Sequence, residues 1–541
     1  MPRFLIVILV LLSALSASAN DVTRFSMQSG SPGGGTPLHD RGLRGEGQVI
    51  AILDTGLDYD SCYFAEADGS PPPLNIGLSS SNVDPRRRKV IAYNFLYACA
   101  EYPGSRGCEN PLDRGAFDNQ GHGTHAAGAA AGDKGAFGAY DYADAIAPAA
   151  KLVVQDAGFI GGDNCSQRPG LGCPLRDLRP LFAQAYAQGA RIHSNSWGDR
   201  QGASAFQLPP TGNYSPGASQ IDEFVFSHPD MVVIFNSGNA GSLGATSLSA
   251  PGVAKNAIQV GGTRIPERGD DVVAGFSGFG PTRDGRIKPD LVGPANVTAG
   301  DSDFDVNSRN CTFSLQPGTS WAAPTIAGAA ALTRQYYTEG FYPSGERNAA
   351  GSFNPSAALI KATLIAAARR VPFREQNNQL RQSLPVPSFE QGYGFPVLDD
   401  ALHFRGESTR LKIYDGVEVS AVGGFSTTLL VAAGKPLRVV LVWTDPPSAP
   451  RSATDSRPVL INDLDLRVTN TAGVARLGND TVGGGVADRL NNVELVNIAA
   501  AEEGGYQIEV SGSRLAATTA QRFALVIVGE FREVRTRGAR R

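Results

Sequence analysis

The sequence predicts an α/β fold with a doubly wound, mostly parallel sheet, followed by a second, smaller all-β sandwich. Three observations support this prediction. Apolar runs of strand length alternate with helical patterns between residues 45 and 404. Single polar residues follow three of these runs, at the sheet edge where such folds gather their ligands. From about residue 405, short β-branched runs separated by turn residues replace the alternation.

The expected elements follow the chain in order. In the first region, strands are expected at 48–53, 151–155, 191–194, 232–235 and 257–260. Helices are expected at 122–131, 176–188, 220–227, 321–337 and 354–367. The sandwich should hold about seven or eight strands, including those at 410–414, 437–443, 464–469, 493–498, 506–510 and 523–529. The predicted divisions are a signal peptide at 1–19, a polar, glycine-rich arm at 20–43, the α/β domain at 44–404 and the sandwich at 405–541.

The stretch Gly318-Thr319-Ser320-Trp321-Ala322-Ala323-Pro324 begins a helix that is small and apolar on every side. Such a pattern predicts a helix buried all round. Ser320 is thereby held at the helix start, and Pro324 is expected close to that start, where a missing N–H does little harm. A serine hydroxyl becomes a good nucleophile only with a base in reach that is oriented by a third group.

Two further stretches supply such groups. Gly121-His122-Gly123-Thr124-His125 places an imidazole at the head of a second small-residue helix. Asp54-Thr55-Gly56-Leu57-Asp58 places a carboxylate directly after the first apolar strand. Asp54, Ser196 and Asn239 each lie just past an expected strand, so we expect them at one edge of the sheet.

In these boxes the chain resembles the subtilases, the subtilisin-like serine endopeptidases, and most of all the large alkaline subtilases with a C-terminal β-sandwich. The order Asp54, His122, Ser320 is the subtilisin order. A fourth box, Ser237-Gly238-Asn239-Ala240-Gly241, is similar to the family's oxyanion-hole segment. The resemblance runs from about residue 42 to the C-terminal end, and four boxes in the right order are highly specific.

The resemblance implies a role for each catalytic residue. Ser320 attacks the scissile carbonyl, His122 carries the proton, and Asp54 orients the imidazole. Asn239 and the backbone N–H of Ser320 receive the charge on the oxygen. This chemistry implies protein or peptide substrates, an acyl-enzyme intermediate and no cofactor for catalysis.

The resemblance also implies substrate-binding residues. Ser196, Trp197 and Gly198 would pair with the substrate backbone as an added strand. Trp197 and the backbone of Ser237 and Gly238 would wall the pocket for the residue before the cut. A pocket with glycine and no charge at its base implies a broad preference for apolar or aromatic side chains.

Other interpretations of these residues remain open. Asp58 and His125 repeat the chemistry of their neighbours, but we expect His125 to be a helix histidine satisfied by its surroundings. An α/β-hydrolase esterase would need Gly-x-Ser-x-Gly and the order Ser, acid, His, which this sequence lacks. An inactive binding or inhibitory protein with this fold is the non-enzyme alternative, against which the intact site residues argue.

The composition is globular, with 42% hydrophobic and 18% charged residues and a net charge of −4. Nucleic-acid binders are usually strongly basic, so no such partner is expected. Arg3, the apolar run 4–12 and Ala17-Ser18-Ala19 predict a signal peptide; the alternative, a membrane anchor, would need a longer run. We therefore expect a secreted, extracellular protein. The arm is shorter than the family's pro-domain, so we expect a different route of maturation.

Six cysteines, an even number, fit an oxidising compartment and allow 15 pairings. Short separations favour Cys99–Cys108 and Cys165–Cys173, which leaves Cys62–Cys311; buried free thiols are the alternative. Sequons that would carry glycans only in a glycosylating source occur at Asn164, Asn213, Asn296, Asn310 and Asn479.

Two further expectations concern single residues. Asp463 and Asp465, in a segment that resembles the family's C-terminal jelly roll, are candidate ligands of a structural calcium ion; the alternative is that they cap backbone N–H groups in a turn. Trp321 stands where many subtilases have methionine, whose thioether is easily oxidised. We therefore expect tolerance of peroxide, and packing around Trp321 that differs from the family's usual pattern.

Overall fold

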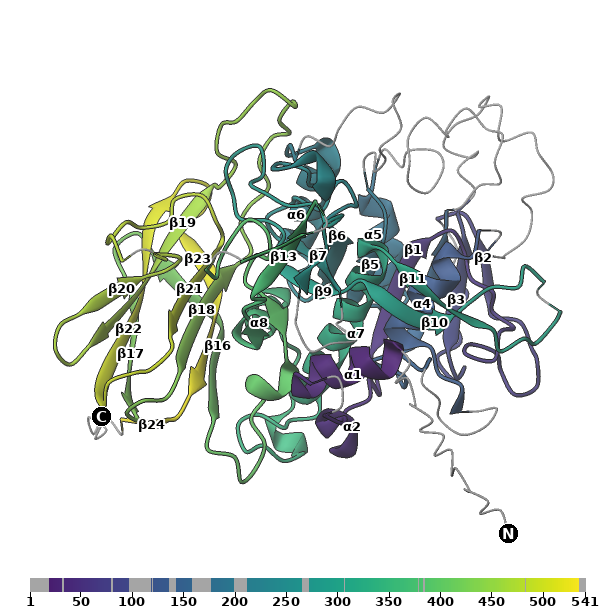
Figure 1. Cartoon of the computed structure of the whole chain (residues 1–541), viewed down its shortest axis with the longest axis horizontal. Helices are drawn as coiled ribbons and strands as arrows, with labels where there is room; N and C mark the ends of the chain where they lie inside the picture. Colours follow the sequence, from purple (N-terminus) through teal and green to yellow (C-terminus); the bar gives the residue numbers. More distant parts are fainter. Residues whose placement is uncertain are drawn as a thin grey trace, which may run out of the picture.

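A computed structural model gives the fold of most of the chain. It describes residues 19–31, 34–78, 81–96, 118, 120–135, 143–157, 177–198, 212–264, 272–305, 307–377, 379–382, 385–481 and 483–534. An 11-stranded mixed sheet with helices on its faces occupies the centre and right of Figure 1. Two antiparallel sheets, of four and five strands, lie at the left.

The central strands of the large sheet are parallel, as predicted. β1 (Val49–Asp54) lies between β4 (Lys151–Asp156) and β5 (Ile192–Asn195), and β5 is followed by β6 (Val232–Asn236) and β7 (Ile258–Arg264). Nearly every residue of these strands is buried. Helices cover both faces of such a sheet, which explains why the strands are continuous apolar runs rather than alternating ones.

The outer strands make the sheet mixed rather than wholly parallel, because β7 pairs with β8 and β13 with β14 in antiparallel fashion. The strands of the large sheet outside the central five are β2 (Leu74–Ile76), β3 (Val90–Phe95), β8 (Val272–Val273), β9 (Leu291–Pro294), β13 (Phe373–Gln376) and β14 (Gln379–Gln382). Two small antiparallel pairs stand apart, and they are β10 (Asn296–Gly300) with β11 (Phe313–Pro317) and β12 (Ala368–Arg369) with β15 (Phe395–Pro396).

All five predicted helices are present; α4 has the predicted ends and the other four have shifted ends. They are α4 (His122–Ala131), α5 (Arg179–Ala187), α6 (Pro216–Ser227), α7 (Thr319–Thr338) and α8 (Ala357–Ala366). Short 3₁₀ turns lie at η4 (Gly241–Leu243), η5 (Ala349–Gly351) and η6 (Leu398–Asp400). Helix α6 begins earlier than predicted because Ser215 caps it, its hydroxyl accepting the N–H of Ala218 at 3.3 Å.

The predicted polar arm contains two helices that pack on the α/β part. They are α1 (Ala19–Ser29) and α2 (Pro37–Asp40). Arg24 is fully buried and donates to the carbonyl of Asp144 at 2.7 Å. Polar side chains here are therefore hydrogen-bonded to the domain. The signal peptide, apart from Ala19, lies outside the described residues.

One predicted disulfide is confirmed. Cys62 is bonded to Cys311 across 249 residues of sequence. This bond ties the segment that follows Asp54 to the β10–β11 hairpin, which leads into Ser320. The other four cysteines lie outside the described residues, so their pairing stays a prediction. Three predicted glycan acceptors, Asn213, Asn310 and Asn479, donate their side-chain amides within the fold.

The C-terminal region contains nine described strands, one more than the upper expectation. The four-stranded sheet has the order β16 (Arg410–Ser420), β23 (Ala520–Gly529), β18 (Leu437–Trp443) and β21 (Val493–Ile498). The five-stranded sheet has the order β20 (Ala475–Leu477), β19 (Asn462–Asn470), β22 (Gly504–Leu515), β17 (Phe425–Val431) and β24 (Phe531–Glu533). The jelly-roll assignment and the boundary at 404/405 stay predictions.

The four-stranded sheet is buried on both faces. Along β18, Val440 and Val442 belong to the core of the large α/β part, whereas Val439, Leu441 and Trp443 belong to the core between the two C-terminal sheets. Helix α8 packs against β18 and β23 and lies between these strands and the large sheet (Figure 1). The four-stranded sheet therefore shares a continuous apolar core with the α/β part.

A buried ion pair crosses the same contact. Lys255 and Asp445 have fully buried side chains and form an ion pair. Lys255 Nζ also donates to the carbonyls of Pro446 at 2.6 Å and Val459 at 3.0 Å, and Asp445 accepts the N–H of Asn462 at 2.7 Å. Burial raises the pKa of Asp445, an effect that the Lys255 charge opposes. The charged atoms of Lys255 and Asp445 are thus bonded to each other and to backbone groups of the 445–462 segment.

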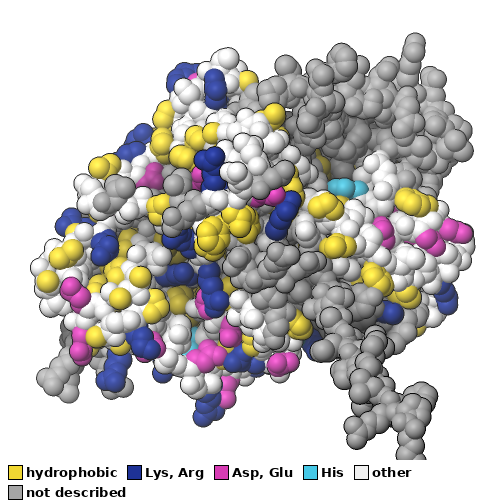
Figure 2. Space-filling view, viewed as in Figure 1, with side chains coloured by type: hydrophobic (Ala, Val, Ile, Leu, Met, Phe, Trp, Pro, Cys, Tyr) yellow, Lys and Arg dark blue, Asp and Glu magenta, His cyan; other side chains and the backbone are white. Residues whose placement is uncertain are grey.

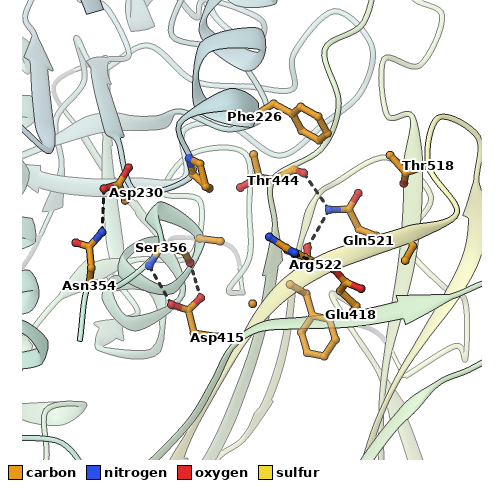
Figure 3. A pocket seen from close by; sticks show the side chains of 15 residues that line it. Phe226, Asp230, Asn354, Ser356, Asp415, Glu418, Thr444, Thr518, Gln521 and Arg522 are labelled. Carbon is orange, nitrogen blue, oxygen red and sulfur yellow. Dashed lines mark hydrogen bonds and ion pairs between the residues drawn. The ribbon is translucent and has the colours of Figure 1, made fainter. Parts of the chain in front are cut away.

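A pocket of about 510 Å³ opens beside this contact, between the end of α6 and the start of α8 on one side and β16 and β23 on the other. Figure 3 shows Asp230, Asp415, Glu418 and Arg522 around it. Asp230 precedes β6, whereas Asn239 follows β6. The pocket therefore lies at the sheet edge opposite to the predicted catalytic residues.

The surface carries both signs of charge. On the face displayed in Figure 2, Lys and Arg side chains are interspersed with Asp and Glu side chains. Among the described helices, none combines the length and the apolar character needed to cross a bilayer.

Candidate active site

Asp54 and His122 are hydrogen-bonded to each other. His122 Nδ1 lies 2.6 Å from Asp54 Oδ1, and the Asp54 side chain is 1% exposed whereas that of His122 is 33% exposed. The same Asp54 oxygen accepts the N–H of Thr55 at 2.8 Å. Because Asp54 ends β1 and His122 begins α4, two rigid elements fix this bond. A carboxylate at Nδ1 leaves Nε2 as the nitrogen that can accept a proton.

Asp118 organises the start of α4 and was missed by the sequence reasoning. Gly121, which precedes the helix, has no side chain to cap it. Asp118 takes that role: Oδ1 accepts the N–H of Gly121 at 2.9 Å and the hydroxyl of Thr55 at 2.9 Å, and Oδ2 accepts the N–H and the hydroxyl of Thr124, each at 2.7 Å. The signal was an Asp three residues before Gly121, the glycine that precedes the helix.

The surroundings of His122 shift its affinity for protons. Burial lowers the pKa of His122, but the charge of Asp54 and its hydrogen bond raise it, and the net pKa lies above the ordinary value of 6.5. The charge of Asp118 adds to the rise. His122 therefore gains stabilisation of its protonated form, which a general base needs during proton transfer.

Trp321 packs between two histidine rings. Its ring centroid lies 4.7 Å from that of His122 and 4.3 Å from that of His125. His125 is buried, and its Nε2 donates to the carbonyl of Val297 at 3.1 Å. Burial lowers the pKa of His125 to about 3, so its ring is neutral. His125 is thus a packed helix histidine, as predicted, although only its Nε2 has a hydrogen-bond partner and its buried Nδ1 has none, and its ring lies against Trp321.

Peroxide is expected to leave most of the activity intact, because Trp321 replaces the oxidisable side chain next to Ser320. The two described methionines, Met27 and Met231, are fully buried. The matched variant is Trp321→Met, which should lose activity in dilute peroxide much faster than the wild type, followed by residual rate and by mass spectrometry. Equal rates of loss in the two proteins would contradict this expectation.

Ser320 lies at the start of α7 and is paired with Ser196. Ser196 Oγ donates to the Ser320 carbonyl at 2.6 Å, and Ser320 Oγ donates to the Ser196 carbonyl at 3.4 Å. In the described structure, Ser320 Oγ forms no hydrogen bond to His122. Ring contact between Trp321 and His122 nevertheless places the two helix starts against each other. Of the predicted triad, Asp54 and His122 are therefore hydrogen-bonded to each other, whereas the Ser320 hydroxyl is hydrogen-bonded to the Ser196 carbonyl.

Pro324 lies inside α7 rather than in its first positions, which corrects the expectation for this residue. A proline lacks the N–H that would bond the carbonyl four residues earlier, and that carbonyl belongs to Ser320. Ser196 Oγ bonds it instead. The proline therefore frees an acceptor that ties the end of β5 to the nucleophile helix.

Asn239 is exposed and oriented by Thr319. Its Oδ1 accepts both the N–H of Thr319 at 2.9 Å and the Thr319 hydroxyl at 2.8 Å. Because a backbone N–H can only donate, the oxygen of the amide must be on this side. The NH₂ group of Asn239 therefore remains available to an outside acceptor.

The predicted substrate-binding residues divide into two groups. Ser196, Trp197 and Gly198 continue past the end of β5, beyond the pairing with β1 and β6. The Trp197 ring packs edge-on against Phe235, 5.1 Å between centroids. The carbonyls of Ser237 and Gly238 are instead occupied within the protein, where they accept N–H groups of Ser249 and Gly278.

Asp463 and Asp465 have a cation from the chain itself. Arg489 Nη1 lies 3.0 Å from Asp463 Oδ2 and 2.7 Å from Asp465 Oδ1. A calcium ion would need to displace this guanidinium. No described backbone N–H donates to either side chain, so the turn-capping interpretation does not describe them, and the calcium interpretation stays a prediction.

Comparison with known proteins identifies the family of the chain. The model of the subtilase family matches residues 45–394, and the chain belongs to that family. It is 26% identical to the serine protease/ABC transporter B family protein tagD of Dictyostelium discoideum over 79% of the chain and 28% of that protein. It is 24% identical to the tagA protein of the same organism, over 92% of the chain and 31% of that protein. The chain thus spans less than a third of these relatives.

A shorter bacterial relative covers the α/β part. Subtilisin Savinase of Lederbergia lenta is 28% identical over 55% of the chain and 80% of that protein. Among solved structures, a serine protease of Aeromonas sobria covers 94% of both chains at 16% identity, with a TM-score of 0.42.

Proposed function

We propose that the protein is a secreted serine endopeptidase that cleaves protein or peptide substrates with Ser320, His122 and Asp54. The observation that carries this proposal is the 2.6 Å bond between His122 Nδ1 and Asp54 at the start of the helix pair that also holds Ser320. Membership of the subtilase family supports the class of reaction. The predicted signal peptide supports secretion, and the reaction needs no cofactor.

In the proposed reaction, Ser320 Oγ turns from the Ser196 carbonyl to His122 Nε2 when substrate binds. In free enzymes this bond is often long and tightens only in the complex. Ser320 Oγ then attacks the scissile carbonyl carbon while His122 takes its proton, and His122 returns that proton to the leaving amine. Water hydrolyses the acyl-enzyme by the same route. Asp54 holds the tautomer and stabilises the imidazolium.

Negative charge on the carbonyl oxygen needs fixed donors. The NH₂ group of Asn239 and the N–H of Ser320 are the candidates, and the two bonds from Thr319 orient Asn239 for this task. The backbone at 196–198, which lies past the pairing of β5 with β1 and β6, would pair with the substrate chain, which favours broad specificity. Selection for Arg or Lys before the cut in a substrate library would contradict the expected apolar preference.

A fluorophosphonate probe tests the proposed function directly. Such a probe phosphonylates a serine only where a base activates it. We expect the wild-type protein to be labelled on Ser320 and Ser320→Ala to remain unlabelled, with mass spectrometry of the modified peptide as the readout. A folded wild-type protein that takes no label would favour the alternative of an inactive binding protein.

Activity is expected to fall as the pH decreases through the pKa of His122, because the base must be neutral. Since this pKa is raised above 6.5, the midpoint of the fall in kcat/KM should lie above pH 6.5. Asp54→Asn removes the largest raising effect and leaves burial, which lowers the pKa, so its midpoint should move to lower pH. Profiles with the same midpoint in both proteins would contradict this assignment.

Asn239→Leu is expected to lower kcat by about 10²–10³-fold with little change in KM, because the donor acts mainly in the transition state. Thr319→Val is the matched control, since it removes one of the two bonds that orient Asn239 but keeps the N–H. Its kcat should fall by about tenfold at most. Steady-state kinetics on a peptide substrate measure both; equal losses would mean that Asn239 acts only by supporting Thr319.

A further inference from the structure

Phe304 combines an exposed aromatic side chain with a strained backbone. It lies in the loop between β10 and β11, and its exposed fraction is 56%. Its φ angle is +65°, in the left-handed region that a residue with a Cβ adopts only at a cost. Neither feature gains stability, because an exposed ring buries little apolar surface and glycine would remove the strain. Strain that persists at such a residue points to a function.

The ring of Phe304 lies beside the start of α4. A Cβ built on Gly121, the residue before His122, would lie 3.7 Å from Phe304 Cζ and 3.8 Å from Phe304 Cε1. These are ordinary contact distances between carbon atoms. The ring therefore borders the residue that precedes the proposed general base.

Hydrogen bonds hold the backbone of this loop in place. The N–H of Phe304 donates to Ser302 Oγ at 3.1 Å, and Ser302 Oγ donates to the carbonyl of Asp118 at 3.4 Å. The N–H of Asp303 donates to Asp58 Oδ2 at 3.2 Å. A fixed backbone and the two χ angles of phenylalanine limit the entropy that is lost when the ring contacts a ligand.

The position of Phe304 assigns it to one side of the scissile bond. The proposed strand for residues before the cut, 196–198, is bonded to Ser320. Phe304 borders Gly121 instead, and no described hydrogen bond joins its loop to 196–198. In the proposed reaction His122 gives its proton to the leaving amine, which belongs to the first residue after the cut. That residue therefore lies beside His122, past Ser320 from the 196–198 strand.

We propose that Phe304 forms one wall of the pocket for the first residue after the cut and selects aromatic and large apolar side chains there. A second ring would bury apolar surface against Phe304 and make edge-to-face or offset contacts with it. Small-molecule and side-chain pockets are typically lined by apolar and aromatic groups of this kind. This inference rests on the proposed endopeptidase function and adds a preference after the cut to the one before it. The competing explanation is that the ring only covers the start of α4.

The test measures which amines capture the acyl-enzyme. The full chain receives a peptide methyl ester with phenylalanine before the cut, together with phenylalaninamide or alaninamide. Ser320 Oγ attacks the ester and expels methanol. The amine nitrogen then attacks the acyl carbon, loses a proton to His122 and displaces Ser320 Oγ, so a peptide bond forms, whereas water yields the free acid. Chromatography of the peptide and the acid gives the preference between the two amines, which depends on the position after the cut.

Wild-type protein is expected to prefer phenylalaninamide to alaninamide, and Phe304→Ala should lower that preference by about tenfold. Phe304→Tyr keeps the ring and should keep the preference. Phe226→Ala is the matched control, because it removes a phenylalanine that is 40% exposed beside the pocket at the opposite sheet edge, and it should also keep the preference. Hydrolysis of the methyl ester, whose leaving group has no side chain, should stay within about twofold of wild type in all three variants.

Phe304→Gly separates the side-chain contact from the strain. It should lose the preference as Phe304→Ala does, and its Tm, measured with Ser320→Ala to prevent self-digestion, should equal or exceed that of Phe304→Ala, because glycine adopts the left-handed region freely. A preference that persists in Phe304→Ala, or that is absent from a wild-type protein that hydrolyses the ester, would overturn this inference and leave the endopeptidase function in place. A folded wild-type protein that does not hydrolyse the ester would overturn the proposed function, and this inference with it.

Discussion

Replacing His122 by alanine is expected to lower kcat by about 10⁶-fold, the size of effect found for the corresponding residue of subtilisin. Without the imidazole, no group accepts the proton of Ser320 Oγ as the bond to the carbonyl carbon forms. The remaining rate would come from substrate binding and the oxyanion donors. Because the His122 side chain is partly exposed and bonds only Asp54, the fold should tolerate the change.

Variants of His122 and Asp54 distinguish the roles of these two bonded residues, because the expected losses of kcat differ. Asp54→Asn keeps the shape of the side chain but favours the wrong tautomer of His122, so kcat should fall by about 10⁴-fold. His228→Gln, a change at a half-buried histidine that ends α6 and precedes β6, should leave kcat within a factor of two or so of wild type. Burst kinetics and circular dichroism would accompany the rates. A His122→Ala protein that retains a hundredth of the activity while folded would remove His122 from the mechanism.

Replacing Lys255 by methionine is expected to lower the free energy of unfolding by about 3–5 kcal/mol. The change leaves Asp445 buried against the α/β part without its cation, although the N–H groups of Ile461 and Asn462 still bond it. Two carbonyls, of Pro446 and Val459, lose their donor as well. Chemical denaturation of Ser320→Ala and of the double variant with Lys255→Met measures the difference.

Two controls interpret that loss. In Lys255→Met with Asp445→Leu, both charges are gone, and much of the stability should return because an apolar pair can replace a buried ion pair. Lys412→Met removes the cation from an ion pair with Glu533, whose side chain is 63% exposed, and should cost less than about 1 kcal/mol. Equal losses in the free energy of unfolding for Lys255→Met and Lys412→Met would show that the buried ion pair contributes no more to stability than the exposed one.

The parts of the fold that could be predicted are those with strong local signals. The strand β18 and the helix α4 have the predicted ends, because a continuous apolar run and a run of alanine and glycine leave few alternatives. The ends of the strands that lead to Asp54 and Ser196 were predicted to within a residue or two. The prediction that these two residues lie at one edge of the sheet follows from those ends. The membership of the subtilase family, read from four short boxes, is confirmed.

The parts that could not be predicted depend on tertiary contacts. Helix α1 is polar, and only its burial against the domain, as through Arg24, makes it part of the fold. Asp118 has a role only because Thr55 and Thr124, distant in sequence from each other, meet it. The bond from Ser196 to the Ser320 carbonyl depends on a proline that lies inside α7. The sequence alone placed this proline too close to the start of the helix.

The four-stranded sheet, apolar on its two sides, has a consequence for how this chain can be shortened. Cutting the chain near residue 405 would uncover the flank of α8 and the inner side of the loop that carries Lys255, so neither piece would stay dissolved as a separate unit. Heating should melt the whole molecule in one calorimetric event, because the α/β part and the four-stranded sheet share an apolar core.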